Sequence, residues 1–261
     1  MQAAKYTQQP VSFEISDVHK CLFASCTQVD VRSNNLDENI GQIFIPIIEK
    51  AHFESFSGIP VKKIRDNAIT EIDVKGVEGS KLEACGGVIL AHCLKSNSSV
   101  TVVDVRSNNL DENIGQLFIP IIEKPYFESF SGIPVKKIRD NAITEIDVKG
   151  VEGRKLEACG GVILAHCLKS NSSVTVVEAF GNMIGPEGGH AFAKALETNT
   201  CIQELILGSQ SKPASIPLKS LRENSVNTLD YSGKELLSEG GIVLAFMLRS
   251  NTSVTKVSGR F

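Results

Sequence analysis

A long internal repeat dominates this sequence and restricts the folds that are available to it. Residues 29–102 and 103–176 are identical at 70 of 74 positions, and a diverged third copy follows from residue 177. The two close copies differ at Ile43/Leu117, Ala51/Pro125, His52/Tyr126 and Ser80/Arg154. This near-identity indicates either a recent tandem duplication or an artefact of sequence assembly. A fixed period of this kind predicts stacked structural units.

A shorter phrase of spaced aliphatic residues recurs inside each copy. In SVTVVDVRSNNL, counted from its first valine, positions 1, 4, 6, 9 and 11 are Val100, Val103, Val105, Asn108 and Leu110. Phrases of this kind, some of them weaker, begin at residues 26, 53, 69, 100, 127, 143, 174, 202, 226 and 254. The intervals are 27, 16, 31, 27, 16, 31, 28, 24 and 28 residues. The 74-residue period is therefore a super-repeat of three units, one of them short.

Each unit changes from a strand pattern to a helix pattern. Positions 4 and 6 alternate with polar neighbours, which predicts a short strand with its apolar side chains on one face. Some fifteen residues later the apolar spacing becomes helical, as in residues 81–97, 186–199 and 238–251. A single strand–helix unit cannot bury both of its apolar faces, whereas a stack of units can. We therefore expect an α/β solenoid with parallel strands on its concave face and helices on its convex face.

The phrase L-x-x-L-x-L-x-x-N-x-L, with valine in place of most leucines, resembles a leucine-rich repeat. A unit of about 28 residues with a full helix is similar to the ribonuclease-inhibitor-like type, which also occurs in NOD-like receptors and Ran GTPase activators. The resemblance covers about residues 26–258. It implies a curved right-handed horseshoe.

The domain organisation follows from where the phrases begin. Residues 1–25 are expected to form an N-terminal cap of a short strand and an amphipathic helix, and residues 26–261 a repeat domain of about ten units. The short units leave no room for a full helix at 59–67 and 133–141, so we expect an extended or single-turn segment there. Proline predicts a shortened or bent helix at Pro46 and Pro120, with the proline facing solvent.

Composition and missing motifs exclude several classes of function. A net charge of −3 disfavours non-specific nucleic-acid binding, and no apolar run approaches the length of a membrane helix. No secretion signal is recognisable and the seven cysteines contain no CxxC pair, so a cytoplasmic protein with reduced thiols is expected. The recurrent Gly-Gly pairs could cradle a phosphate, but equivalent copies favour close packing of each helix start against the next unit. Nucleotide-binding motifs are not found.

The residue pairs that suggest chemistry do not form a site. Cys85 and His92, repeated at Cys159 and His166, lie about 10 Å apart along a helix, too far to share a zinc ion. No serine or cysteine elbow accompanies any histidine. We therefore predict a protein that is not an enzyme and that has no metal and no cofactor.

Charged residues of the strands are the candidate binding residues. Position 5 points outward from the sheet and is mostly acidic, with Ser57, Ser131 and Ile206 as interruptions, while position 7 is basic. Columns of opposite charge side by side would offset the repulsion between like charges on neighbouring strands. These charged columns either select a partner or only keep the sheet soluble. Phe180 at position 7, together with Ile206 at position 5, adds an apolar anchor. The candidate residues are Asp30, Arg32, Asp73, Lys75, Asp104, Arg106, Asp147, Lys149, Glu178 and Phe180.

These patterns predict a non-catalytic scaffold that binds a protein partner through its concave face, with no nucleic acid and no membrane. One alternative is regulation of a GTPase through the repeat loops, as in Ran GTPase activators; another is the ligand-sensing region of a larger receptor. The last phrase, which begins at Val254, has no following helix. The chain is therefore expected either to self-associate through this uncapped edge or to be part of a longer protein.

Overall fold

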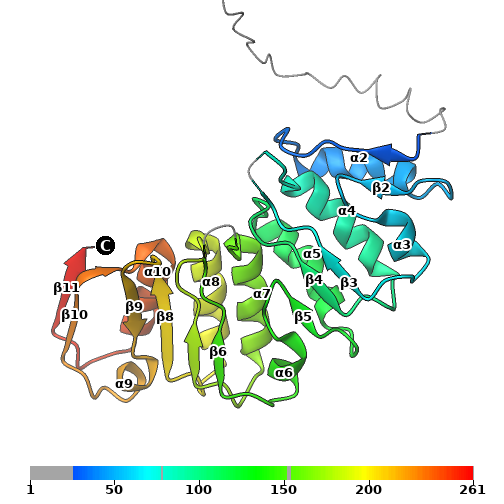
Figure 1. Cartoon of the computed structure of the whole chain (residues 1–261). Helices are drawn as coiled ribbons and strands as arrows, with labels where there is room; N and C mark the ends of the chain where they lie inside the picture. The colour runs from blue at the N-terminus through cyan, green and yellow to red at the C-terminus, as the bar shows by residue number, and fades with distance from the viewer. Residues whose placement is uncertain (1–25, 78, 152–153, 261) are drawn as a thin grey trace, which may run out of the picture.

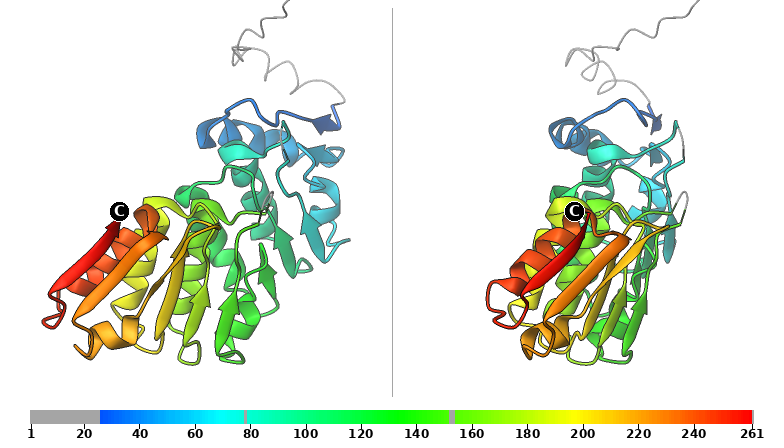
Figure 2. Two further views of the ribbon diagram at one scale, coloured as in Figure 1. Left: turned by 60° about the vertical axis from the view of Figure 1, so that its left-hand side comes forward. Right: turned by 90° about the vertical axis from the view of Figure 1, so that its left-hand side faces the viewer.

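The computed structural model describes residues 26–77, 79–151 and 154–260. Strands and helices alternate along these ranges, and successive units lie side by side from the blue to the red end of the chain (Figure 1). Seen along the stack, the helices form one layer and the strands another (Figure 2). The chain is thus an α/β protein with alternating strand–helix units, compatible with a leucine-rich-repeat-like architecture. The predicted cap over residues 1–25 lies outside the described residues.

The strands pair in the register that the repeated phrase predicts. Position 4 of each phrase faces position 4 of a neighbouring phrase, as in Ile72↔Val103↔Phe130 and Val29↔Phe56. The strands are β1 (Gln28–Val29), β2 (Ser55–Phe56), β3 (Glu71–Asp73), β4 (Val102–Asp104), β5 (Ser129–Phe130), β6 (Glu145–Asp147), β7 (Val176–Glu178), β8 (Glu204–Gly208), β9 (Pro213–Ile216), β10 (Thr228–Glu235) and β11 (Lys256–Arg260). Every pair is parallel except β8–β9.

The parallel ladder is interrupted after each short unit. The described strands form the sheets β1–β2, β3–β4–β5, β6–β7–β8–β9 and β10–β11. At the end of the first sheet, Phe56 and Ile59 exchange both backbone hydrogen bonds, at 3.0 and 2.7 Å, in an antiparallel bridge. Because the N–H and C=O of one strand residue point to the same side, Phe56 has no backbone group left for the next parallel strand.

The third copy enlarges this same reversal into a hairpin. Phe130 bridges Ile133 three residues later, whereas Leu205 of β8 pairs with Ile216 of β9 eleven residues later. Eight additional residues thus extend the tight turn of the close copies into two antiparallel strands. The prediction of an all-parallel sheet is therefore wrong at β9, because the insertion lets the reversing segment make further ladder hydrogen bonds.

The helices follow the expected alternation of full and short units. They are α2 (Glu38–Ile48), α3 (Val61–Arg65), α4 (Glu83–Lys95), α5 (Glu112–Ile122), α6 (Val135–Arg139), α7 (Glu157–Lys169), α8 (Gly185–Leu196), α9 (Leu218–Arg222) and α10 (Leu237–Leu248). The short units contain the five-residue helices α3 and α6, which confirms the single-turn prediction. Asp111 caps α5 by accepting a hydrogen bond from the Ile114 N–H at 3.0 Å.

The two prolines fall near the ends of α2 and α5 and face solvent. Pro46 and Pro120 are exposed, as predicted, and each helix continues for two residues beyond its proline. Both helices have 11 residues, against 13 in α4 and α7. The predicted shortening is therefore small, since a proline in the last turn removes one N–H donor without preventing two further helical residues.

Glycines allow the helices to approach one another. A Cβ atom on Gly161 of α7 would lie 2.5 Å from Cγ2 of Ile184, and one on Gly189 of α8 would lie 2.7 Å from Cα of Glu239 at the start of α10. A Cβ atom on Gly241 of α10 would meet no atom within 4 Å. The second glycine of the pairs in α7 and α8 therefore allows the next unit to approach, whereas no described unit packs on α10 at Gly241.

One prediction about the strand residues is wrong. Ser57 and Ser131, expected to point outward at position 5, are 2% and 3% exposed. Their backbones are left-handed, with φ of 49° and 51°, because strands β2 and β5 end at the preceding phenylalanine. The hydroxyl of Ser131 instead accepts a hydrogen bond from the Val105 N–H of the neighbouring unit at 3.2 Å. The outward acidic column is therefore interrupted where the chain reverses.

Candidate strand-face binding surface

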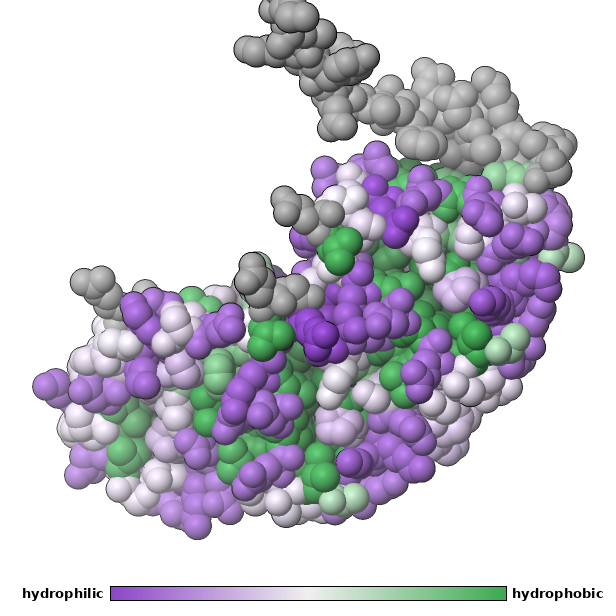
Figure 3. All heavy atoms as spheres, in the orientation of Figure 1, coloured by the Kyte–Doolittle hydropathy of each residue, from purple (hydrophilic) through white to green (hydrophobic). Residues whose placement is uncertain are grey.

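The predicted charged residues come together as ion pairs on the outward side of the strands, which we call the strand face. In four units, the basic residue at position 7 pairs with the acidic residue at position 5. Four such pairs form, namely Arg32–Asp30 at 2.5 Å, Lys75–Asp73 at 2.7 Å, Arg106–Asp104 at 2.5 Å and Lys149–Asp147 at 3.1 Å. Figure 3 shows hydrophilic residues distributed over this side of the molecule, with smaller hydrophobic areas between them.

Two lysines also connect neighbouring units. Asp73 of β3 and Asp104 of β4 are in register, and the Nζ of Lys75 reaches the carboxylates of both, at 2.7 and 3.4 Å. Lys149 makes the equivalent pairs with Asp147 and with Glu178 of β7. The columns are therefore interleaved, and each pair of facing carboxylates has a cation between its members.

The pairing changes the acidity of the carboxylates. Burial by itself would raise the pKa of Asp104, but hydrogen bonds from Arg106 and the charges of Arg106 and Lys75 outweigh it and hold the pKa below its ordinary value. For Lys75, the hydrogen bond to Asp73 raises the pKa despite partial burial. Both groups are thus held in their charged forms.

The predicted apolar anchor is partly covered. Phe180 is half-buried, and the Nζ of Lys149 lies 5.6 Å from the centre of its ring, within the range of a cation–π contact. Ile206 of β8 lies in register with Glu178 of β7, so it continues the outward column as predicted. Phe180 therefore contacts the ion-pair network through Lys149 and adds an aromatic ring to it.

Asparagines behind the strand face fix the loops that carry these charges. The Nδ2 of Asn108 donates to the carbonyl oxygens of Val74 and Val105, both at 2.8 Å, and its Oδ1 accepts from the Leu82 N–H at 2.9 Å. Asn108 is fully buried, and it joins two neighbouring units. Asn182 repeats the pattern one copy later. Position 9 of the phrase thus satisfies backbone groups that burial would otherwise leave unpaired.

The cysteine and histidine pairs lie on the helix side and do not form a common site. Burial raises the pKa of Cys85 to about 12, so this thiol is poorly suited to act as a nucleophile. The Nε2 of His92 lies 3.0 Å from Oε1 of Glu49, the residue that follows α2, and His166 pairs with Glu123 in the same way. Among the residues that the structure describes, no three histidine, cysteine or acidic side chains could hold a metal ion.

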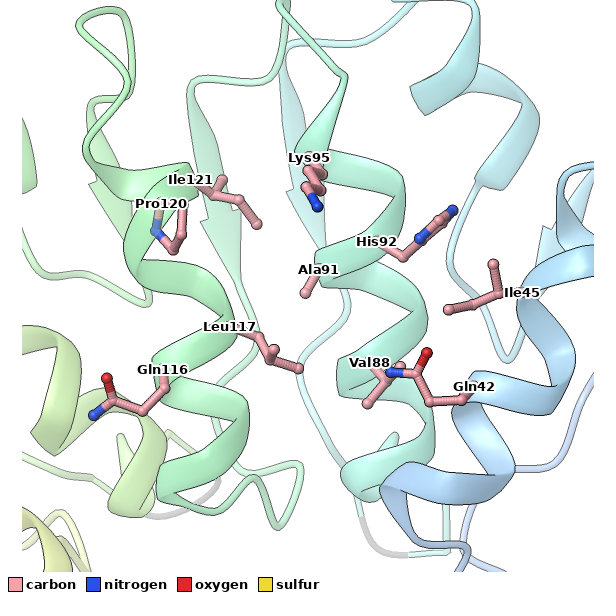
Figure 4. Close-up of a pocket in the computed structure, with 10 residues that line it drawn as sticks. All are labelled: Gln42, Ile45, Val88, Ala91, His92, Lys95, Gln116, Leu117, Pro120 and Ile121. Atoms are coloured by element: carbon pink, nitrogen blue, oxygen red, sulfur yellow. The ribbon is translucent and has the colours of Figure 1, made fainter.

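Sequence reasoning predicted none of the hollows on the surface of the molecule. A groove of about 330 Å³ lies on the helix side between α2, α4 and α5, where Leu117 points from α5 toward α4 (Figure 4). A smaller cavity of about 220 Å³ lies beside the strand face and includes Lys149 and Arg154 in its lining. The signal for the second was present in the sequence, because Arg154 is one of the four differences between the close copies.

Comparisons with known proteins give little further guidance. No protein-family model matches the chain. A solved structure described as leiomodin-1 actin-binding site 2 is similar to it with 16% sequence identity and a TM-score of 0.30, over 58% of this chain and 78% of that one. A likeness at this level carries no argument about function. In the described ranges, no helix is long and apolar enough to cross a membrane.

Proposed function

We propose that this chain is a leucine-rich repeat protein of the ribonuclease-inhibitor-like type, with about ten units over residues 26–261 in a right-handed horseshoe. The in-register position-4 residues and the buried Asn108 and Asn182 support the repeat assignment.

We further propose that the strand face is the concave surface of this horseshoe and binds a protein partner in the cytoplasm, without catalysis. The observation that carries this proposal is the in-register array of interleaved ion pairs, with Lys75 between Asp73 and Asp104 as its centre. Such an array presents a fixed pattern of charges at the spacing of the strands. Electrostatic complementarity of this kind governs partner choice and the rate of association more than affinity.

Charge reversal tests the proposal. We expect the triple variant Asp73→Lys, Asp104→Lys and Asp147→Lys to lose the partner that the wild-type chain captures from native cytosol. The matched control reverses the same number of exposed charges on the helix side, at Glu38, Glu197 and Glu223. If the strand-face variant, verified as folded by circular dichroism, captures the same partner as the control, the strand face is not the binding surface.

The outer face of α10 supports self-association. Ala245 of α10 is exposed, whereas Ala165, at the same place after the Gly-Gly pair of α7, is only 2% exposed beneath α8. With Gly241 also open, this face has the shape that accepts a neighbouring helix elsewhere in the chain. We propose that a second copy covers it. Sedimentation velocity should then show a dimer that Ala245→Glu converts to a monomer, and an unchanged mass distribution would refute the idea.

A further inference from the structure

The cavity beside the strand face carries a positive charge that no carboxylate among the described residues neutralises. Its volume is about 220 Å³, and the residues that line it include Arg106, Ser131, Asp147, Lys149 and Arg154. Arg154 is exposed, and its side chain makes no hydrogen bond or ion pair with any described residue. Three cations thus border the cavity, against one carboxylate in its lining.

The other two cations differ in what they can still bind. Lys149 already contacts the carboxylates of both Asp147 and Glu178. Arg106 donates to Asp104 through Nε and Nη2, while its Nη1 points toward Gly132, at 3.4 Å from where a Cβ atom on that glycine would lie. Within the described part of the chain, Nη1 has no hydrogen-bond acceptor. Arg106 and Arg154 therefore both retain free N–H donors at one cavity.

The first copy shows what Arg154 adds. The equivalent position there is Ser80, while the neighbouring Lys75–Asp73 pair has the same composition as Lys149–Asp147. The two copies thus provide the same scaffold with and without the additional cation. The second copy therefore carries one more positive charge at this point. No carboxylate among the described residues pairs with that charge.

We propose that the cavity between Arg106 and Arg154 binds an oxyanion carried by the protein partner, and this inference rests on the function proposed above. The shared chemistry is a group with at least two acceptor oxygens, which is either the carboxylate of an aspartate or glutamate or the phosphate of a phosphorylated side chain. Planar guanidinium groups suit both, because each can donate two parallel hydrogen bonds. The free hydroxyl hydrogen of Ser131 offers one more donor in the same lining.

Short labelled peptides test the inference with probes of known chemistry. Fluorescence anisotropy would measure the binding of a glutamate-rich hexapeptide, of a hexapeptide with one phosphoserine, and of a glutamine-rich peptide as the neutral control. We expect an anionic peptide to bind and the neutral one not to bind, and the tighter anionic peptide identifies the source of the oxyanion. Because Arg154→Ser removes charge-assisted hydrogen bonds of this kind, we expect it to weaken binding of the anionic peptide about tenfold.

The close copies supply the control variants. Arg154→Ser introduces the residue that the first copy carries at this position, so the fold should tolerate it, and Arg154→Lys should recover only part of the affinity. Ser80→Arg should create a second site and raise the stoichiometry from one peptide to two. Wild-type affinity in Arg154→Ser, or equal binding of the neutral peptide, would overturn the inference. Partner capture that survives Arg154→Ser while peptide binding is lost would leave the strand-face proposal intact.

Discussion

The equivalent glycines of α8 and α10 provide a direct test of how the units pack. Both Gly189 and Gly241 are the second glycine of a Gly-Gly pair inside a helix, but a Cβ atom at Gly189 would meet the backbone of Glu239 at 2.7 Å, whereas one at Gly241 would meet nothing within 4 Å. Replacing a helical glycine by alanine contributes about 1 kcal/mol of helix propensity. The same change can therefore have opposite signs at the two positions.

The magnitudes follow from the contacts. Overpacking of a close interface costs about 1–3 kcal/mol, and a clash with backbone atoms of α10 cannot be relieved by rotating a side chain. We therefore expect Gly189→Ala to lower the free energy of unfolding by up to about 2 kcal/mol, after the propensity gain is included. Gly241→Ala should raise it by about 1 kcal/mol.

Equilibrium urea unfolding followed by circular dichroism measures both effects. The midpoint should fall for Gly189→Ala and rise for Gly241→Ala, at a protein concentration low enough to keep the chain monomeric. The two variants carry the same chemical change, so the difference between them reports the packing alone. A midpoint for Gly189→Ala equal to or above that of Gly241→Ala would refute the close approach of α8 and α10.

Three further predictions concern single side chains. Asn108→Ala should lower the free energy of unfolding by about 2–3 kcal/mol in urea titrations, because it leaves buried backbone groups unpaired, whereas Asn34→Ala, at an exposed equivalent position, should change it by less than about 1 kcal/mol. The lowered pKa of Asp104 implies stability that is present above the unfolded pKa of about 3.9 and lost as the pH falls through the lower folded value. Asp104→Asn should therefore shift the urea midpoint less at pH 2 than at pH 7. Cys85, with its pKa raised to about 12, should react with a thiol reagent at pH 8 only after guanidinium unfolds the chain, and fast labelling of the folded protein would contradict its burial.

The strand register could be predicted from the sequence because the repeated phrase contains the necessary information. The spacing of Val100, Val103 and Val105 alternates at period two and so places one side chain of each strand toward the core. Its recurrence then makes position 4 of one strand face position 4 of the next, including the two strands in which the phrase is reduced to Phe-x-x-Phe-x-Gly and position 4 is Phe56 or Phe130. The pairing of positions 5 and 7 follows from the same alternation.

The reversals and the cavity could not be predicted in this way. Whether Ser131 points outward depends on where β5 ends, and that depends on the antiparallel bridge between Phe130 and Ile133, a contact that the period of the phrase does not encode. Arg154 was visible as a difference between copies, but its significance depends on which side chains already neutralise one another around it. Lys149 pairs with two carboxylates, whereas Arg154 pairs with none among the described residues. Only the three-dimensional structure distinguishes these two side chains.

The hairpin β8–β9 indicates where this architecture can grow. The strand before the reversal and the short helix after it keep their places whether the turn spans three residues, as at Ile133, or eleven, as at Ile216. Additional sequence at this corner therefore joins the edge of the sheet as an antiparallel strand, while the parallel register of β7 and β8 is kept. The tight turns at Ile59 and Ile133 are accordingly the places where a new loop, with a new specificity, could be grafted onto the repeat while the strands around it remain as they are.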